Sequence, residues 1–190
     1  MTQRRRAERC PRCELPPVLC LCPHLQALAS PLGVITISHA KETGRSSNSA
    51  RLLPLLLEGA VVLPRGGPDA PCVMPPFDGP AAVLFPSRDA APLTPEMRLR
   101  TLLVPDGNWR QARRIALRTP EMARLPRLRL PIGAAPLARL RGHPDTARLA
   151  TIEAVARALG VLGHSALQNH LETAWTRFAE TIWRLREGGI

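Results

Sequence analysis

Four cysteines near the start of the sequence have the number and spacing of a metal site. Two residues separate the first pair and one residue separates the second: Cys10, Cys13, Cys20 and Cys22. Four thiolates match the tetrahedral coordination of zinc, and a short proline-rich segment that cannot bury a core of its own would gain folding energy from the metal. The segment 10–24 is therefore predicted to be a structural zinc module. His24 could replace one thiolate, and redox or disulfide chemistry is the alternative.

A second candidate for chemistry is Asp106, which ends the apolar run "TLLVPD" at residues 101–106. A carboxylate that follows a buried strand lies at the sheet edge where binding sites are built. It also stands just before a predicted helix, 108–117, where a carboxylate can cap free backbone amides. The residue types alone therefore leave two interpretations open, a site carboxylate and a capping Asp-Gly turn. Trp109 in the same stretch could stack on a ligand or anchor the helix to the core.

Polar residues also gather after the predicted strand 31–39, in the stretch that leads into a predicted helix at 47–59. A helix N-terminus with arginines nearby can bind an anion through free amides and side chains. The alternative is a capped loop whose charges are solvated. The candidates in this stretch are His39, Glu42, Arg45, Asn48 and Arg51. Pro54 predicts a kink or an early break in the helix that follows.

Two further stretches place polar residues beside predicted elements. "LFPSRDA" follows a predicted strand and contains Asp89, and "RGHPDTARLATIEA" begins at Arg141 and leads into a predicted helix. In the second stretch Thr151 could simply cap the helix, and Glu153 could simply favour its positive end. A structural role is therefore the alternative for each of these residues.

The elements that would position these residues alternate between strands and helices. Apolar runs predict strands at 31–39, 60–64, 81–86, 101–106 and 127–133, and three- and four-residue spacing predicts helices at 47–59, 108–117, 151–163 and 165–188. Strands separated by helices or long crossings indicate an α/β fold with an open, mostly parallel sheet and helices on both faces. In such a sheet, ligands bind where the strands end.

The charge balance predicts a polyanionic partner. The chain of 190 residues carries 26 Lys and Arg against 15 Asp and Glu, a net charge of +11, and nearly all the cations are arginines, whose planar donors suit phosphate. A general drift of composition toward arginine is the alternative. No apolar stretch is long enough for a membrane helix and no signal peptide is recognisable, so we expect a cytoplasmic protein with reduced thiols. The sequence lacks the glycine loops of dinucleotide and NTP sites.

Taken together, these stretches resemble the DTW-domain family, whose members are similar to the bacterial tRNA-uridine aminocarboxypropyltransferases. Six blocks occur in family order over about residues 9–187: the cysteines, the pattern from His39 to Leu53, "LFPSRDA", "PDGNWRQAR", "LPRLRLP" and "RLATIEAVARAL". Some positions depart from the family pattern. Asn108 stands where the signature Asp-x-Thr-Trp has threonine, although asparagine can still cap a helix, and small hydroxyl residues are missing elsewhere.

The resemblance implies a SPOUT-like α/β fold with a C-terminal trefoil knot. From the residues we expect a disordered basic arm at 1–9 and a zinc module at 10–24, and the resemblance makes residues 25–190 the catalytic domain. It implies that strand-end loops bind S-adenosylmethionine through Phe85, Pro86, Asp89, Asp106, Gly107, Trp109, Leu130, Ile132, Leu149, Thr151 and Glu153. It also implies an RNA-binding set made of His39, Glu42, Arg45, Asn48, Arg51, Arg110, Arg113, Arg114 and Arg141.

The reaction implied by the resemblance moves the 3-amino-3-carboxypropyl group of S-adenosylmethionine to N3 of a tRNA uridine and leaves methylthioadenosine. Asp106 is the candidate general base for the N3 proton, or else a residue that binds the donor. The alternatives are a SPOUT-type RNA methyltransferase, a zinc-stabilised RNA-binding protein without activity, and a DNA-binding regulator. We expect tRNA as the partner, and neither DNA nor a membrane. The sequence leaves open whether the protein is a monomer or a homodimer.

Overall fold

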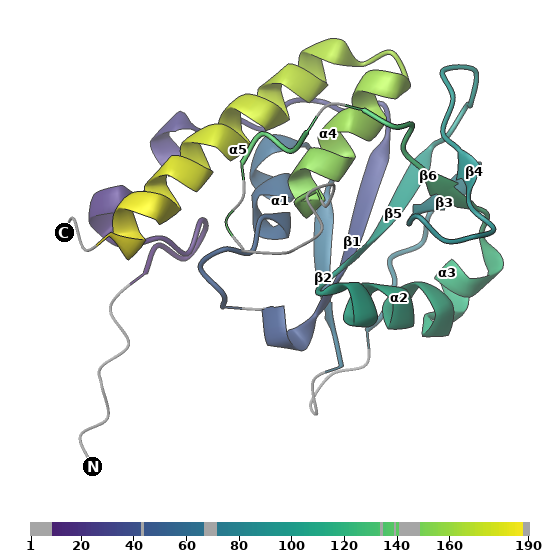
Figure 1. The fold of residues 1–190 in the computed structure, drawn as a ribbon, viewed down its shortest axis with the longest axis horizontal. Coiled ribbons are helices and arrows are strands. Elements are labelled where there is room, and N and C mark those ends of the chain that lie inside the picture. Colours follow the sequence, from purple (N-terminus) through teal and green to yellow (C-terminus); the bar gives the residue numbers. More distant parts are fainter. Residues whose placement is uncertain are drawn as a thin grey trace.

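A six-stranded, all-parallel β-sheet forms the centre of the computed structural model, which describes residues 9–42, 44–66, 72–133, 135–138, 140 and 149–187 (Figure 1). The strands lie across the sheet in the order β2-β1-β5-β3-β6-β4. Their bounds are β1 Gly33–His39, β2 Val61–Arg65, β3 Ala81–Leu84, β4 Ala91–Pro92, β5 Thr101–Asp106 and β6 Arg127–Arg129. Because the paired strands are parallel, their ends lie along one edge of the sheet, which we call the carboxyl edge.

β1 and β5 lie side by side in the middle of the sheet, where both faces are covered and apolar residues are needed on each. Every residue of β5 is buried, and so are all residues of β1 except the two at its ends. The predicted strands 31–39, 60–64, 81–86 and 101–106 are confirmed to within two residues at either end.

Two strands differ from the prediction. The predicted strand 127–133 is confirmed only for Arg127–Arg129, and the chain leaves the sheet before Pro131, which has no N–H for the ladder. β4 was not predicted, because it has only two residues and one of them is Pro92. Both strands lie at one side of the sheet, where short strands are common.

Helices cover both faces of the sheet, as predicted (Figure 1). Their bounds are α1 Leu53–Leu56, α2 Trp109–Arg118, α3 Pro120–Arg124, α4 Thr151–Val161 and α5 Ser165–Arg186. Successive strand residues point to opposite faces. Val34 and Leu102 therefore pack with α1, α4 and α5 on one face. Ile35 and Leu103 pack with α2 and α3 on the other.

The predicted helix 47–59 is only partly helical. A 3-10 turn, η4 (Ala50–Leu52), comes first, and Pro54 lies in the first turn of α1, where no intrahelical N–H bond is lost. The helix ends at Leu56. Pro54 therefore marks the start of a short helix and does not kink a longer one.

The cysteine segment, residues 10–24, packs on the main core and does not form a unit apart from it. Cys13 and Leu15 are fully buried and belong to the same apolar cluster as Phe178 of α5. Two 3-10 turns, η1 (Pro17–Leu19) and η2 (Cys22–His24), shape the second half of the segment. The division predicted between residues 24 and 25 stays a prediction.

Some expectations concern residues that the structure does not describe. These residues include 1–8 of the predicted basic arm, and they also include Arg141. The trefoil knot stays a prediction, because residues 134, 139 and 141–148, between β6 and α4, also lie outside the described part of the chain. Within that described part, no helix combines the length and the hydropathy needed to span a bilayer.

Candidate active site

Asp106 is the last residue of β5 and lies at the carboxyl edge, where it is only 8% exposed. Its partner across the sheet is Ser38 of β1, whose hydroxyl donates a hydrogen bond of 2.6 Å to Oδ2. Thr151, the first residue of α4, donates a hydrogen bond of 2.5 Å to Oδ1. Two hydroxyl donors stabilise the charged form of a carboxylate and fix its orientation. The carboxyl edge therefore presents an oriented carboxyl group at this point.

Asn108, and not Asp106, supplies the N-cap of α2. The Asn108 side chain accepts a hydrogen bond of 3.0 Å from the N–H of Gln111, whose side chain in turn accepts one of 2.8 Å from the N–H of Asn108. Gly107 lies between β5 and this N-cap, and its φ is 150°. A residue with a side chain would place its Cβ only 2.9 Å from the Cβ of Gln111, which is too close for two carbon atoms. The interpretation of Asp106 as a capping residue is therefore wrong, whereas the capping role expected for Asn108 is confirmed.

Asp106 lines a cavity of about 910 Å³ at the carboxyl edge. This volume is in the range of small-molecule sites. The walls come from the loops after β1, β3, β5 and β6 and from α4. Most of the residues that the resemblance assigned to S-adenosylmethionine lie on these walls: Phe85, Pro86, Asp106, Gly107, Trp109, Leu130, Ile132, Leu149 and Thr151. The structure thus brings them together, and their contact with the donor stays a prediction.

Phe85 and Trp109 form an aromatic pair on the cavity wall. Their rings stack with 4.9 Å between the centroids and 28° between the planes. Phe85 is buried, whereas Trp109 remains 43% exposed. The contact therefore anchors the start of α2 to the end of β3 and still leaves part of the indole at the cavity, so that both interpretations of Trp109 are compatible with its position.

Asp89 and Glu153 do not lie on the cavity wall, although the resemblance assigned both to the donor. Asp89 is exposed and pairs with Arg127 of β6 at 2.5 Å. Glu153 is buried and accepts hydrogen bonds from the N–H groups of Leu137, at 2.6 Å, and Ala150, at 3.0 Å. Glu153 therefore connects the loop after β6, which lines the cavity, to the start of α4. It positions these two segments and does not itself line the cavity.

Glu42 and Asn48, two residues of the predicted RNA-binding set, line the cavity and are 3% and 7% exposed. The Asn48 side chain accepts a hydrogen bond of 2.9 Å from the N–H of Ala50 and donates one of 3.2 Å to the carbonyl of Glu42. The hydroxyl of Ser49 accepts a bond of 3.4 Å from the N–H of Ile152 in α4. The burial of Glu42 and Asn48 does not fit contact with RNA phosphate. These two residues instead form the part of the cavity wall beside α4.

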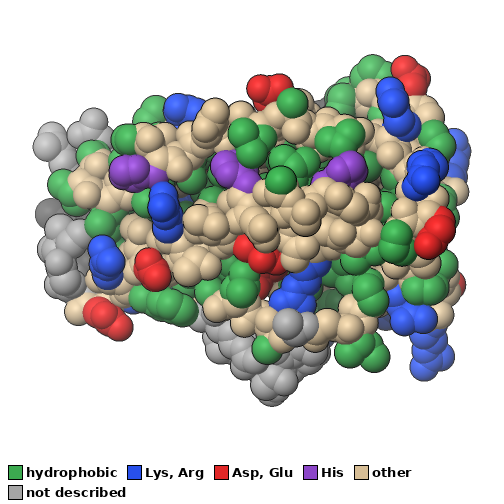
Figure 2. Space-filling model, turned by 90° about the horizontal axis from the view of Figure 1, so that it is seen from above, with side chains coloured by type: hydrophobic (Ala, Val, Ile, Leu, Met, Phe, Trp, Pro, Cys, Tyr) green, Lys and Arg blue, Asp and Glu red, His purple; other side chains and the backbone are tan. Residues whose placement is uncertain are grey.

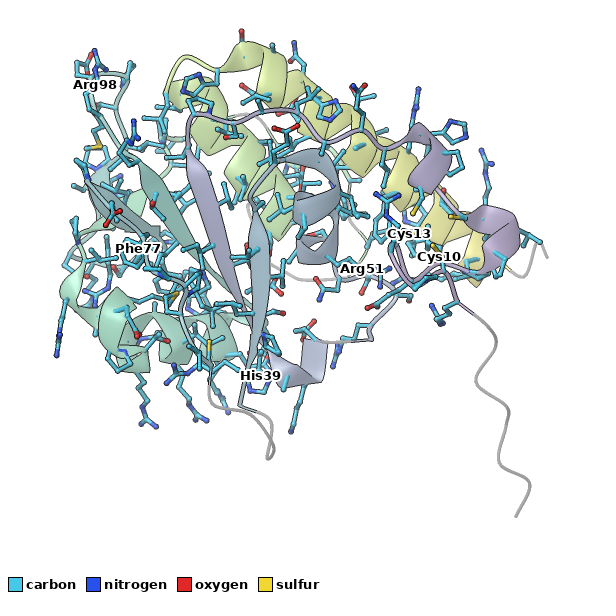
Figure 3. The ribbon with its side chains drawn as sticks, turned by 180° about the vertical axis from the view of Figure 1, so that it is seen from behind. Cys10, Cys13, His39, Arg51, Phe77 and Arg98 are labelled. Carbon is cyan, nitrogen blue, oxygen red and sulfur yellow. The ribbon has the colours of Figure 1, made fainter. Side chains whose placement is uncertain are left out.

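Arg51 is also enclosed. Its side chain is only 9% exposed and forms an ion pair of 2.8 Å with Glu14. Figure 3 shows Arg51 beside the segment that carries Cys10 and Cys13. A guanidinium enclosed in this way is poorly placed to contact RNA phosphate, and its contact with RNA stays a prediction. Sequence spacing could not reveal this enclosure, because Glu14 lies 37 positions away.

The rest of the predicted RNA-binding set that the structure describes is accessible. His39, at the end of β1, is half-buried, and its Nδ1 accepts a hydrogen bond of 3.1 Å from the N–H of Lys41. Four arginines are exposed: Arg45 after β1, and Arg110, Arg113 and Arg114 on α2. Figure 3 shows His39 at the carboxyl edge and Arg98, which precedes β5, at the opposite edge.

Some of the exposed basic side chains lie close to the cavity. The exposed arginines of α2 and of the loop after β1 lie at the carboxyl edge, near the cavity. Figure 2 views the molecule from the opposite edge, where the blue side chains are scattered among hydrophobic and acidic ones. The positive charge next to the cavity therefore suits a polyanion that approaches from the carboxyl edge.

Ser38 and Arg157 are among the residues of the site that the sequence analysis missed. Ser38 reads as part of an apolar strand, and only its register opposite Asp106 shows its role. Arg157 lines the cavity and donates a hydrogen bond of 2.8 Å to the carbonyl of Ala135. Its position could have been inferred, because Thr151, Ala154 and Arg157 recur every three residues and so share one face of α4.

The four cysteine sulfurs lie within 4.8 Å of one another. The sulfur atoms of Cys10 and Cys22 are 3.6 Å apart, and those of Cys13 and Cys20 are 3.7 Å apart. Tetrahedral zinc with bonds of about 2.3 Å holds its sulfurs about 3.8 Å apart, whereas a disulfide requires about 2.0 Å. The cluster therefore fits zinc better than disulfides. Backbone hydrogen bonds from Cys13 and Arg12 lower the pKa of Cys10 to about 6, whereas desolvation by burial raises the pKa of Cys22 to about 12.

Comparison with known proteins identifies similar chains. The family model described as the DTW domain matches residues 7–183. The tRNA-uridine aminocarboxypropyltransferase 2 of Drosophila melanogaster is 31% identical over 172 residues, which cover 83% of this chain and 67% of that protein. Among solved structures, the SAM-dependent rRNA:acp-transferase Tsr3 from Vulcanisaeta distributa matches with a TM-score of 0.55 and 23% identity, over 83% of this chain and 84% of the other. This last similarity shows a shared fold.

Proposed function

The chain belongs to the DTW domain family, and on that basis we propose that it transfers the 3-amino-3-carboxypropyl group of S-adenosylmethionine to N3 of a uridine in tRNA. In this reaction an N–C bond forms at N3, the bond between that carbon and the sulfonium breaks, the N3 proton passes to the solvent and methylthioadenosine leaves. The observation that carries the proposal is the fixed carboxylate of Asp106 on the wall of a cavity that is large enough for the donor.

The residues of the cavity fit such a donor. The aromatic pair of Phe85 and Trp109 offers an apolar surface for adenine, and Asp106 offers a negative charge for the donor's positive groups. When bound, the donor supplies a sulfonium leaving group next to the carbon that is attacked. The chain's own contribution is to align donor and uridine and to exclude water from the cavity.

We propose that Asp106 binds the positive charge of the donor and does not act as the general base. Both of its oxygens already accept hydrogen bonds from hydroxyl groups, of Ser38 and Thr151, and these bonds favour the charged form. A carboxylate stabilised in this way is a weak proton acceptor and a good electrostatic anchor.

We propose that tRNA binds at the carboxyl edge through exposed arginines. Arg110, Arg113 and Arg114 project from α2, which begins directly after Asp106, and Arg45 follows β1. Such contacts position a nucleic acid through its phosphates. The target uridine has to leave its stack for N3 to enter the cavity. The relative from Drosophila melanogaster acts on tRNA by its name, whereas the structural neighbour acts on rRNA, and the greater sequence identity of the first favours tRNA.

We further propose that the cysteine cluster holds a structural zinc ion, with Cys10, Cys13, Cys20 and Cys22 as its ligands. The sulfur separations support this set. The cluster lies against α5 and shares its core, so its role is to hold the N-terminal segment on the body of the molecule.

Mass spectrometry of the nucleosides after reaction tests the proposed function. The protein is incubated with S-adenosylmethionine and either unmodified tRNA or an rRNA fragment. A 3-amino-3-carboxypropyl adduct on uridine of tRNA is expected. A methyl adduct would establish the methyltransferase alternative, and modification of the rRNA fragment alone would overturn the choice of tRNA. Binding of tRNA without binding of S-adenosylmethionine would indicate an RNA-binding protein without activity.

A further inference from the structure

The guanidinium of Arg51 connects three parts of the chain that are far apart in sequence. It donates a hydrogen bond of 2.8 Å to the carboxylate of Glu14 and lies over the ring of Phe178 in α5, with 5.2 Å from its central carbon to the ring centroid. It also donates hydrogen bonds to the backbone carbonyls of Arg45, at 3.2 Å, and Ser46, at 2.8 Å. Arg51 thus joins the cysteine segment, α5 and the loop after β1.

The carbonyls that Arg51 holds belong to the wall loop, which we define as residues 45–49. Three of its residues, Ser47, Asn48 and Ser49, line the cavity. The far end of this loop is held by α4, through the bond between Ser49 and the N–H of Ile152. Arg51 therefore fixes one end of the wall loop and α4 fixes the other.

Glu14 has an unusual backbone conformation that supports a role for its side chain. Among the residues that the structure describes, it is the one non-glycine residue with a positive φ, of 55°. Glycine would adopt this conformation without steric cost, whereas a residue with a side chain is disfavoured there. Strained positions of this kind are found where the side chain has a task. The carboxylate of Glu14 balances the charge of Arg51, which would otherwise be poorly solvated.

We propose that Arg51 is a positioning residue that couples the metal-held cysteine segment to the wall loop, so that affinity for the donor depends on the pair of Glu14 and Arg51. A guanidinium can serve several acceptors in fixed directions, whereas an ammonium on a flexible stem cannot. The inference rests on the proposed function only in naming S-adenosylmethionine as the ligand of the cavity. Loss of the pair leaves the cysteine ligands intact but releases the wall loop.

The test compares Glu14→Gln and Arg51→Lys with the wild type, each loaded with zinc. Three quantities are measured: zinc content, backbone amide exchange of the wall loop, and the dissociation constant for S-adenosylmethionine by calorimetry. Both variants are expected to keep their zinc, to exchange the Asn48 amide faster, and to bind the donor about tenfold more weakly, the effect of one lost charged hydrogen bond. Glu14→Gly removes the same carboxylate and also the backbone strain, so it is expected to weaken donor binding as Glu14→Gln does and to lower thermal stability less than Glu14→Gln.

The matched control is Glu172→Gln on α5, which removes the same charge from a carboxylate that is hydrogen-bonded at 2.8 Å to Gln168. It is expected to behave as the wild type does in exchange and binding. Unchanged exchange in the wall loop of both Glu14→Gln and Arg51→Lys would overturn the coupling. So would weaker donor binding without faster exchange, because the effect would then not pass through the loop. If the wild type does not bind S-adenosylmethionine, the proposed function fails, and the exchange data still decide the coupling.

Discussion

Ser38 and Asp106 lie opposite each other on the neighbouring strands β1 and β5, and the Ser38 hydroxyl donates a hydrogen bond of 2.6 Å to the Asp106 carboxylate. The pair is buried at the carboxyl edge, and Thr151 of α4 completes it. Two strands and a helix from distant parts of the sequence thus hold one negative charge at the wall of the cavity. This arrangement makes Asp106 the centre of the site.

Replacing Ser38 with alanine is expected to weaken binding of S-adenosylmethionine about tenfold to a hundredfold. One oxygen of Asp106 then loses its fixed donor, and a hydrogen bond to a charged group contributes about 1.5 to 3 kcal/mol. Calorimetric titration with the donor measures the effect. Ser30→Ala is the control, because Ser30 bonds only the backbone of Leu32 outside the site. Donor affinity equal to that of the wild type would show that the orientation of Asp106 is not important.

Replacing Trp109 with alanine is expected to weaken donor binding about threefold to tenfold, because an aromatic contact contributes about 0.5 to 1.5 kcal/mol beyond its buried area. The effect on thermal stability is expected to be small, since the indole is 43% exposed. Trp183→Ala on α5 is a matched control, with an indole that is 39% exposed and away from the cavity. Equal donor affinities for the two variants would show that Trp109 does not contribute to donor binding.

Removing zinc is expected to lower the melting temperature by about 10 °C, the equivalent of about 3 kcal/mol for a chain of this size. The reason is that Cys13 and Leu15 belong to the main core, so that their release exposes apolar surface. Cys13→Ser is expected to reproduce the effect, whereas Cys72→Ser, outside the cluster, is not. Thermal unfolding with and without a chelator measures it, and an unchanged melting temperature would exclude a structural metal.

Replacing Arg113 or Arg114 with glutamine is expected to weaken tRNA binding and to lower the slope of log affinity against log salt by about one for each lost phosphate contact. Donor affinity should not change, because neither residue lines the cavity. Arg184→Gln, an exposed arginine on α5, is the control. If all three variants show the wild-type salt slope, RNA binds elsewhere.

Much of the fold follows from local patterns in the sequence. The runs that form β1 and β5 are apolar and bounded by polar residues, so that strands and their ends could be predicted, and Asp106 with them. β4 could not be predicted, since two residues carry no pattern and the strand exists only through its pairing with β6. The short length of α1 could not be predicted either, because it depends on the position of Pro54 relative to the 3-10 turn that comes before the helix.

The direction in which a side chain points was harder to predict than the region to which it belongs. Arg45 and Arg51 stand in the same polar stretch, yet one is exposed and the other is enclosed by Glu14 and Phe178. The partners of Arg51 are distant in sequence, and no local pattern identifies them. Ser38 was missed for the same reason, because its role depends on the register of β1 against β5.

The by-product released from S-adenosylmethionine in the presence of unmodified tRNA tests the central claim most directly. Transfer of the 3-amino-3-carboxypropyl group releases methylthioadenosine, whereas methyl transfer releases S-adenosylhomocysteine, and chromatography separates the two. We expect the wild type to form methylthioadenosine in proportion to modified tRNA, and Asp106→Asn to form far less, since it loses the negative charge that holds the donor. Formation of S-adenosylhomocysteine, or full activity of Asp106→Asn, would contradict the account.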